Sequence, residues 1–223
     1  MEILRSQPSL VDQVYEAILS RIEAGQFGPD ARLVQEEIAE KLGVSRQPVQ
    51  QALLLLRNEG VLISAPGRGL MVAPLDEHKV RNVYEIRASL DALAVVKAAR
   101  RADPRAQREG TEYILRGREA VARQSISDMI AADMAFHHFL YELSGNPLIA
   151  ETASPHWTYL RCVMGAVLMQ GESPRDIWAE HEAILRTVAV GDVAEAERLS
   201  RAHVNNATDS LLRQLDQEAA VAR

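Results

Sequence analysis

The 223-residue sequence predicts a mainly α-helical protein built from two parts, residues 1–75 and residues 76–223. Apolar residues recur at helical spacing in both parts. Two β-prone runs around a Pro/Gly-rich turn occur only in the first part, whereas helix start signals recur through the second. The predicted linker is Pro74-Leu75-Asp76, because proline disfavours continuation of the preceding strand.

Three helices are predicted in the first part. They cover residues 9–24, residues 35–42 and a stretch that begins at Ser45 and stops at Gly60. The Ser45 hydroxyl is expected to accept a first-turn N–H and so cap the third helix. One face of this helix is apolar. The other carries Arg46, Gln47, Gln50, Leu54 and Arg57.

A β-hairpin is predicted after the third helix, from residues 61–64 and 70–73 with a Pro/Gly-rich turn between them. Helix, helix, turn, helix and hairpin together make a winged helix-turn-helix. The polar start of the third helix suits the major groove, where Arg46 can read guanine and Gln50 adenine. At the hairpin tip, Arg68 can meet a phosphate and Gly69 allows close approach. The alternative is a small helical domain with a solvated polar face.

The second part reads as helix throughout. A helix over residues 77–101 is followed by Asp103-Pro104, an N-cap with proline at the first helical position. Three later capping boxes or close relatives are Ser125-x-x-Asp128, Ser173-x-x-Asp176 and Asp192-x-x-Glu195. About six helices result, one of them split near Ser154-Pro155. They predict an all-α antiparallel helical bundle.

Composition limits where the protein acts. The net charge of -6 argues against a polybasic coat for nucleic acid but leaves room for a local basic face. No apolar run reaches transmembrane length, and the first residues lack the pattern of a signal peptide. A single cysteine, Cys162, allows no intrachain disulfide and fits a reducing compartment. We therefore expect a cytoplasmic protein with no membrane partner.

Four residues of the second part suggest a metal site. Asp133 and His137 are four apart and share a helix face, while His181 and His203 lie on apolar stripes of two later helices. Three imidazoles and a carboxylate suit zinc, nickel or a similar divalent ion, and not a calcium cage. The alternative is that His137, His181 and His203 are histidines of the core without a ligand role. His78, His138 and His156 are assigned no ligand role.

The first part resembles the winged-helix domain of GntR-family repressors over residues 10–73. Residues 33–49, 53–60 and 67–72 carry the resemblance, which implies that Arg46, Arg68 and Gly69 contact DNA. The chain departs from that family at two places. Gln50-Gln51 stands where the family often has Arg-Glu, and Glu36 where the best-known members have Arg. A shifted or weaker operator is therefore expected.

The second part resembles the bundle of the FadR-type (FCD) branch of these regulators over residues 79–212. Asp133-x-x-Phe136-His137, residues 143–147, Glu180-His181 and Ala202-His203 carry the resemblance. It implies that Asp133, His137, His181 and His203 hold a divalent ion that helps bind a small carboxylate effector.

Three further residues are candidates for effector contact. Arg87 matches a pocket-facing position of the FCD branch, and a guanidinium is a natural clamp for a carboxylate. The alternative for Arg87 is a surface pair with Asp91, one turn away. Arg161 and Asn206 are the other two candidates, Asn206 because it follows His203 by one turn.

The sequence thus predicts a homodimeric, ligand-responsive transcriptional repressor. It is expected to bind a near-palindromic double-stranded DNA operator. The bundle is expected to bind the effector and to dimerise. A metal-responsive regulator and a purely structural ion remain alternatives. A metal-dependent hydrolase is disfavoured, because no general base or nucleophile motif accompanies the cluster and the DNA-reading part would have no role. The effector's chemical class stays open.

Overall fold

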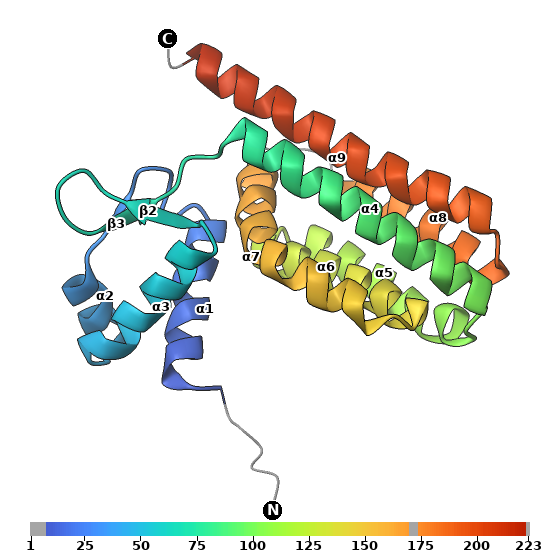
Figure 1. Cartoon of the computed structure of the whole chain (residues 1–223), viewed down its shortest axis with the longest axis horizontal. Coiled ribbons are helices and arrows are strands. Elements are labelled where there is room, and N and C mark those ends of the chain that lie inside the picture. Colours follow the sequence, from blue (N-terminus) through green and yellow to red (C-terminus); the bar gives the residue numbers. More distant parts are fainter. Residues whose placement is uncertain (1–7, 170–173, 222–223) are drawn as a thin grey trace, which may run out of the picture. The chain divides into compact units, whose positions relative to one another are not determined.

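The computed structural model describes residues 8–169 and 174–221 (Figure 1). Contacts divide the chain into two units, residues 1–74 and 75–223, and each is described by itself. The described part of the first unit holds three helices and three short strands. In chain order these are α1 (Leu10–Glu23), β1 (Arg32–Leu33), α2 (Gln35–Leu42), α3 (Arg46–Asn58), β2 (Leu62–Ser64) and β3 (Leu70–Val72).

The strands form one antiparallel sheet in the order β1-β3-β2, so Met71 of β3 pairs with Arg32 on one side and with Ile63 on the other. The predicted hairpin is β2 and β3. Strand β1 was not predicted, because two residues are too few for an alternating pattern. The predicted Ser45 cap is wrong in its chemistry: Ser45 occupies the N-cap position of α3, but its side chain makes no cap hydrogen bond.

Helices α1 and α3 pack against each other through aliphatic side chains. The buried residues of this pair are Val14, Ile18, Leu19, Ile22, Val49, Ala52, Leu53 and Leu56. Burial of this face fixes the rotation of α3 and leaves its polar face exposed, as the helical spacing predicted.

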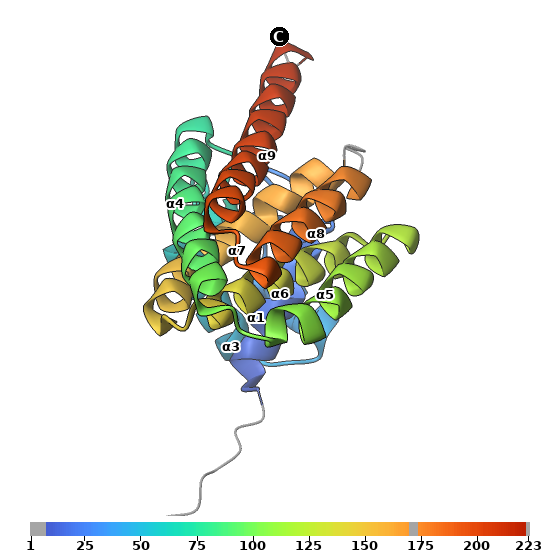
Figure 2. The ribbon, with the colours of Figure 1, turned by 90° about the vertical axis from the view of Figure 1, so that its right-hand side faces the viewer.

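Six helices make up the described second unit, as predicted, and it contains no strand. They are α4 (Glu77–Arg101), α5 (Arg105–Ala122), α6 (Ile126–Ser144), α7 (Pro147–Met169), α8 (Pro174–Val190) and α9 (Val193–Val221). Figure 2 shows α4 and α9 running side by side, and α4 also packs on α6. Helix α6 further contacts α5 and α7, so it lies within the bundle.

The helix ends match the capping residues predicted from the sequence, with two exceptions. Ser125 accepts from the Asp128 N–H, and Asp192 accepts from the Glu195 N–H. The Ser173 box lies outside the described residues. Helix α5 begins at Arg105, one residue later than predicted, so Pro104 takes the cap position. The predicted break near Pro155 is wrong, because α7 continues through this proline.

The bundle core is aliphatic and aromatic and forms two clusters, with α6 contributing to both. Gly117 of α5 lies against the Trp178 ring of α8, where a Cβ would come within 2.1 Å of ring atoms. The small residue therefore allows the ring to pack closely on α5. None of the described helices is long and apolar enough to cross a membrane.

Candidate metal centre and DNA-contacting face

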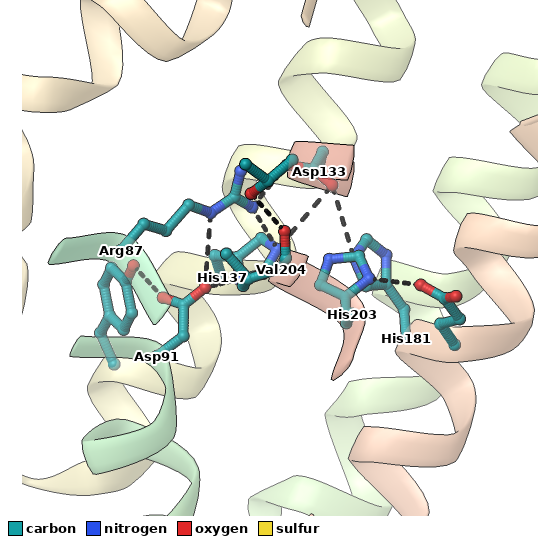
Figure 3. A network of polar contacts seen from close by, with 10 residues as sticks. Arg87, Asp91, Asp133, His137, His181, His203 and Val204 are labelled. Atoms are coloured by element: carbon teal, nitrogen blue, oxygen red, sulfur yellow. Dashed lines mark hydrogen bonds and ion pairs between the residues drawn. The ribbon is translucent and has the colours of Figure 1, made fainter. Parts of the chain in front are cut away.

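Four side chains from three helices converge inside the bundle (Figure 3). Asp133 and His137 come from α6, His181 from α8 and His203 from α9. All four are buried, and one potential ligand atom from each lies within 4.8 Å of the other three. The helical spacing placed Asp133 and His137 on one face, and the packing of α8 and α9 brings the other two imidazoles to it.

The closest approaches join atoms that carry lone pairs. His181 Nε2 lies 3.1 Å from His203 Nε2 and 3.4 Å from Asp133 Oδ1. His137 Nε2 lies 3.8 Å from Asp133 Oδ1. Nitrogen and oxygen donors grouped in this way match the ligand set of zinc or nickel.

Two of the imidazoles are oriented by carboxylates on neighbouring helices. His203 Nδ1 lies 2.7 Å from Glu180 Oε2, and Asn206 Nδ2 donates to Glu180 Oε1 at 3.0 Å. His137 Nδ1 lies 3.2 Å from Asp91 Oδ2. A carboxylate only accepts, so His203 Nδ1 carries a proton and His203 Nε2 presents a lone pair to the group. The His137–Asp91 contact is close but lacks the geometry of a hydrogen bond.

The carboxylate of Asp91 is itself held in place. The Tyr141 hydroxyl donates to its Oδ1 at 2.5 Å, and Arg87 Nε lies 3.4 Å from its Oδ2. Burial alone would raise the pKa of Asp91, but His137 and Arg87 outweigh it and hold the pKa below its usual value. Asp91 is therefore a charged group.

His181 tests whether a cation fits the group. Its ring stacks on Phe136 at 4.4 Å between centroids, and its Nδ1 is buried without a hydrogen-bond partner. Burial and then the neighbouring positive groups hold the pKa of His181 well below its usual value, so the ring is neutral. A neutral imidazole facing the lone pair of His203 leaves at least one nitrogen unsatisfied. A divalent ion bound by the Nε2 atoms would satisfy these lone pairs.

Arg87 supplies the positive charge next to the four donors. Its Nη2 lies 2.7 Å from His137 Nε2 and 3.4 Å from Asp133 Oδ2. Burial alone would lower the pKa of Arg87, but the charges of Asp133 and Asp91 raise it above its usual value. The Arg87–Asp91 pair exists, yet it is buried and not the surface pair considered from the sequence.

Both tryptophans of the chain touch this group. The Trp157 ring lies 5.9 Å from the His137 ring, and the Trp178 ring lies 4.8 Å from the His181 ring in an edge-on arrangement. Arg87 Cζ lies 5.0 Å from the centre of the Trp157 ring. The imidazoles are thus enclosed by aromatic side chains that keep water out.

The other predicted effector residues lie farther out. Asn206 is exposed and bonds to Glu180, so it reaches His203 only through that carboxylate. Arg161 lies on α7 and is half-buried. The contacts of Asp91 and Glu180 with the histidines were not predicted from the sequence. Asp91 and His137 are 46 residues apart, and Glu180 and His203 are 23 apart, which is beyond the reach of a spacing rule.

The predicted DNA-contacting residues lie on one helix and one turn. The exposed side chains of α3 include Arg46, Gln47, Gln50 and Arg57, and the exposed turn between β2 and β3 holds Arg68 and Gly69. Gly69 has a φ of 96°, a backbone conformation that favours glycine. Arg46 Nη1 pairs with Glu36 Oε1 of α2 at 3.0 Å, so one predicted DNA contact carries a neighbouring anion.

Comparison with known proteins identifies the family. Residues 82–206 match the family described as "FCD domain", and residues 10–72 match "Bacterial regulatory proteins, gntR family". The chain belongs to the GntR family and carries an FCD domain. It is therefore a DNA-binding transcriptional regulator, a class of protein that is usually not enzymatic.

Curated relatives agree with this assignment, and solved structures share the fold. The chain is 28% identical over 149 residues to the HTH-type transcriptional regulator McbR of Escherichia coli, covering 67% of each chain. It is 27% identical over 201 residues to an uncharacterized HTH-type regulator of Streptomyces ambofaciens, covering 90% of this chain and 84% of the relative. The solved structure of E. coli McbR has a TM-score of 0.79 at 23% identity, covering 94% of this chain and all of the other. A putative GntR regulator from Rhodococcus gives 0.76, also at 23% identity, covering 91% and 97%.

Proposed function

We propose that this regulator senses a small carboxylate in a bundle that also holds a divalent metal ion, zinc or nickel. The observation that carries the proposal is the convergence of Asp133, His137, His181 and His203 inside the bundle. A cation bound by the Nε2 atoms and the carboxylate would satisfy lone pairs that face one another in a buried space. The ion would supply positive charge and open coordination positions for the effector's oxygens.

The chain's own residues perform the remaining tasks. Asp91 and Glu180 orient His137 and His203, and Arg87 provides the guanidinium that recognises a carboxylate. The arginine already contacts His137 and Asp133, so an effector carboxylate at Arg87 would lie next to the ion. Arg161 and Asn206 remain candidates for secondary effector contacts.

Residues 1–75 would read DNA through Arg46, Gln47, Gln50 and Arg57 of α3 and through Arg68 and Gly69 of the wing. A homodimer would place two such units on the half-sites of a near-palindromic operator. Residues 76–223 would mediate dimerisation and effector binding. In this proposal the protein is a cytoplasmic repressor, and effector binding weakens operator binding with a coupling of about 1–3 kcal/mol.

The test compares metal-stripped protein with zinc- or nickel-loaded protein by thermal unfolding and by operator binding, against a panel of small carboxylates. A ligand that binds only the folded state raises its stability. The proposal predicts that one acid raises the Tm and releases DNA, and does so only when the metal is present. If the metal alone releases DNA and every acid is inactive, the protein is instead a metal-responsive regulator. If metal does neither, the proposed centre is absent.

A further inference from the structure

The turn between β2 and β3, residues 65–69, is held by few contacts of its own. Gly67 and Gly69 have φ angles of 92° and 96°, and a Cβ added at either would meet nothing within 4 Å apart from its chain neighbours. The Ala65 N–H donates to Gly69 O at 3.1 Å and closes the base of the turn. Pro66, Gly67 and Arg68 lie beyond this hydrogen bond and are exposed. Because glycine leaves the backbone free, such a tip loses much conformational entropy when it is fixed in one shape.

A side chain from a different strand reaches this tip. Arg32 Nη2 donates to Pro66 O at 2.5 Å, across 34 residues of sequence. A hydrogen bond from a charged donor is shorter and stronger than one between neutral groups. The tip is therefore tied to the sheet by Arg32 as well as by the backbone of the turn.

The backbone of Arg32 is itself fixed. Arg32 stands on β1, where it pairs with Met71 of β3. The residue before it, Ala31, accepts from the Val72 N–H at 3.0 Å, and the residue after it, Leu33, is buried in the core. Arg32 thus joins a paired strand at its backbone to the tip of the turn at its guanidinium.

No carboxylate competes for this guanidinium. Within residues 8–169 and 174–221 Arg32 forms no ion pair, whereas Arg46 of α3 pairs with Glu36. The carbonyl of Pro66 is neutral, so Arg32 keeps its full positive charge while bonded to it. A DNA phosphate next to the turn therefore meets no anion at Arg32, and the hydrogen bond to Pro66 does not have to break for DNA to bind.

We propose that Arg32 is a positioning residue of the wing: through the Pro66 carbonyl it holds the turn in the shape that presents Arg68 and Gly69 to DNA. A turn that is ordered in the free protein does not have to be ordered on binding, and this raises affinity. The inference rests on the proposed DNA contact of Arg68 and Gly69 and adds the residue that orients them.

The first test needs no DNA. Hydrogen exchange is measured by mass spectrometry on the full chain, in peptides that span residues 62–72. Arg32→Met should speed exchange at the Ala65 amide about three- to tenfold, the effect of losing one hydrogen bond. Arg21→Met removes the same charge from α1 and should leave this amide unchanged. Arg32→Lys keeps a donor on a stem of similar length and should restore most of the protection.

The second test is a double-mutant cycle on DNA. The probe is a labelled duplex that the unaltered full chain selects from random DNA, and anisotropy gives Kd at several salt concentrations. Arg68→Met should weaken binding and reduce the salt slope by about 1. Arg32→Met alone should weaken binding about three- to tenfold. Added to Arg68→Met it should weaken binding less than about twofold, because the turn then has no arginine to present.

The outcomes separate this inference from the contact on which it rests. Equal losses from Arg32→Met with and without Arg68 would mean that Arg32 contacts DNA itself, which overturns the positioning role. Unchanged exchange at Ala65 in Arg32→Met overturns it as well. If exchange rises but Arg68→Met binds the duplex as tightly as the unaltered chain, the proposed DNA contact of the wing is wrong, and Arg32 holds a turn that does not bind DNA.

Discussion

The first unit holds the Arg46–Glu36 pair in water, whereas the bundle holds the Arg87–Asp91 and Arg87–Asp133 pairs in its interior. Arg46 and Glu36 lie 3.0 Å apart with side chains that are 70% and 56% exposed. Arg87 lies 3.4 Å from both Asp91 and Asp133, with side chains that are 9% exposed or less. Water and salt screen the first pair, and little water reaches the second.

This difference separates two ways of building a binding site. An exposed pair contributes about 0–1 kcal/mol to stability, so Arg46 can leave Glu36 for a phosphate or a base. In a buried cluster each charge is stabilised mainly by its charged partners. Removing one partner therefore lowers the stability of the folded protein strongly. The operator face should therefore respond to mutation in affinity and salt dependence, and the bundle should respond in folding as well.

Loss of the buried guanidinium should have the largest effect. Arg87→Leu leaves Asp91 and Asp133 without their cation and should lower the free energy of unfolding of metal-free protein by about 3–5 kcal/mol. Arg81→Leu removes an exposed arginine paired with Glu77 on the same helix, and should cost about 0–1 kcal/mol. Urea unfolding measures both. Similar small losses would mean that water already solvates the Arg87 cluster.

The second-largest effect is expected from loss of one imidazole, which should weaken metal binding. His181→Ala removes a central donor and should reduce zinc affinity by more than the roughly 10–100-fold that loss of an outer partner costs. His138→Ala is the control, because His138 is half-buried on the same helix as His137 but is not one of the four converging residues. Competition with a zinc chelator gives the affinities. Equal zinc binding in both variants would remove His181 from the centre.

Loss of an orienting carboxylate should have a smaller effect. Glu180→Gln keeps an oxygen that can accept from His203 Nδ1 but removes its charge, so zinc affinity should fall by about 10-fold. Glu182→Gln removes a charge from the same helix, where Glu182 pairs with Arg118 at the surface. If the two variants lose the same affinity, the effect is one of net charge and not of the Glu180–His203 contact.

The smallest effect is expected at the exposed pair. Glu36→Gln frees Arg46 and removes an anion from the DNA-contacting face, so operator affinity should rise a few-fold, equivalent to about 0.2–1 kcal/mol. Glu37→Gln removes a charge from the next residue and controls for net charge. Fluorescence anisotropy of labelled operator DNA, measured at two salt concentrations, distinguishes them. A gain that is equal in both variants would show that the pair with Arg46 is irrelevant.

Much of this architecture is readable from the sequence, because periodicity and caps are local. The apolar face of α3 and the Ser125 and Asp192 caps depend on residues within two turns. The shared face of Asp133 and His137 follows from the helical repeat in the same way. One local rule fails at Pro155, because α7 continues through this proline.

The sequence does not predict which side chains on different helices contact each other when the helices pack. Nothing local links Asp91 to His137 or Glu180 to His203, since each pair depends on how two helices are rotated against each other. The spacing of apolar residues along a helix predicts which residues are buried. Only the structure shows which residues they contact.

The placement of the two tryptophans has a spectroscopic consequence. Trp157 and Trp178 are the only indoles in the chain, and each packs against an imidazole of the cluster of Asp133, His137, His181 and His203. Intrinsic emission therefore reports on the bundle, with no contribution from an indole in residues 1–74. A change of emission on adding operator DNA would measure directly how strongly the two halves of this regulator communicate, without any label.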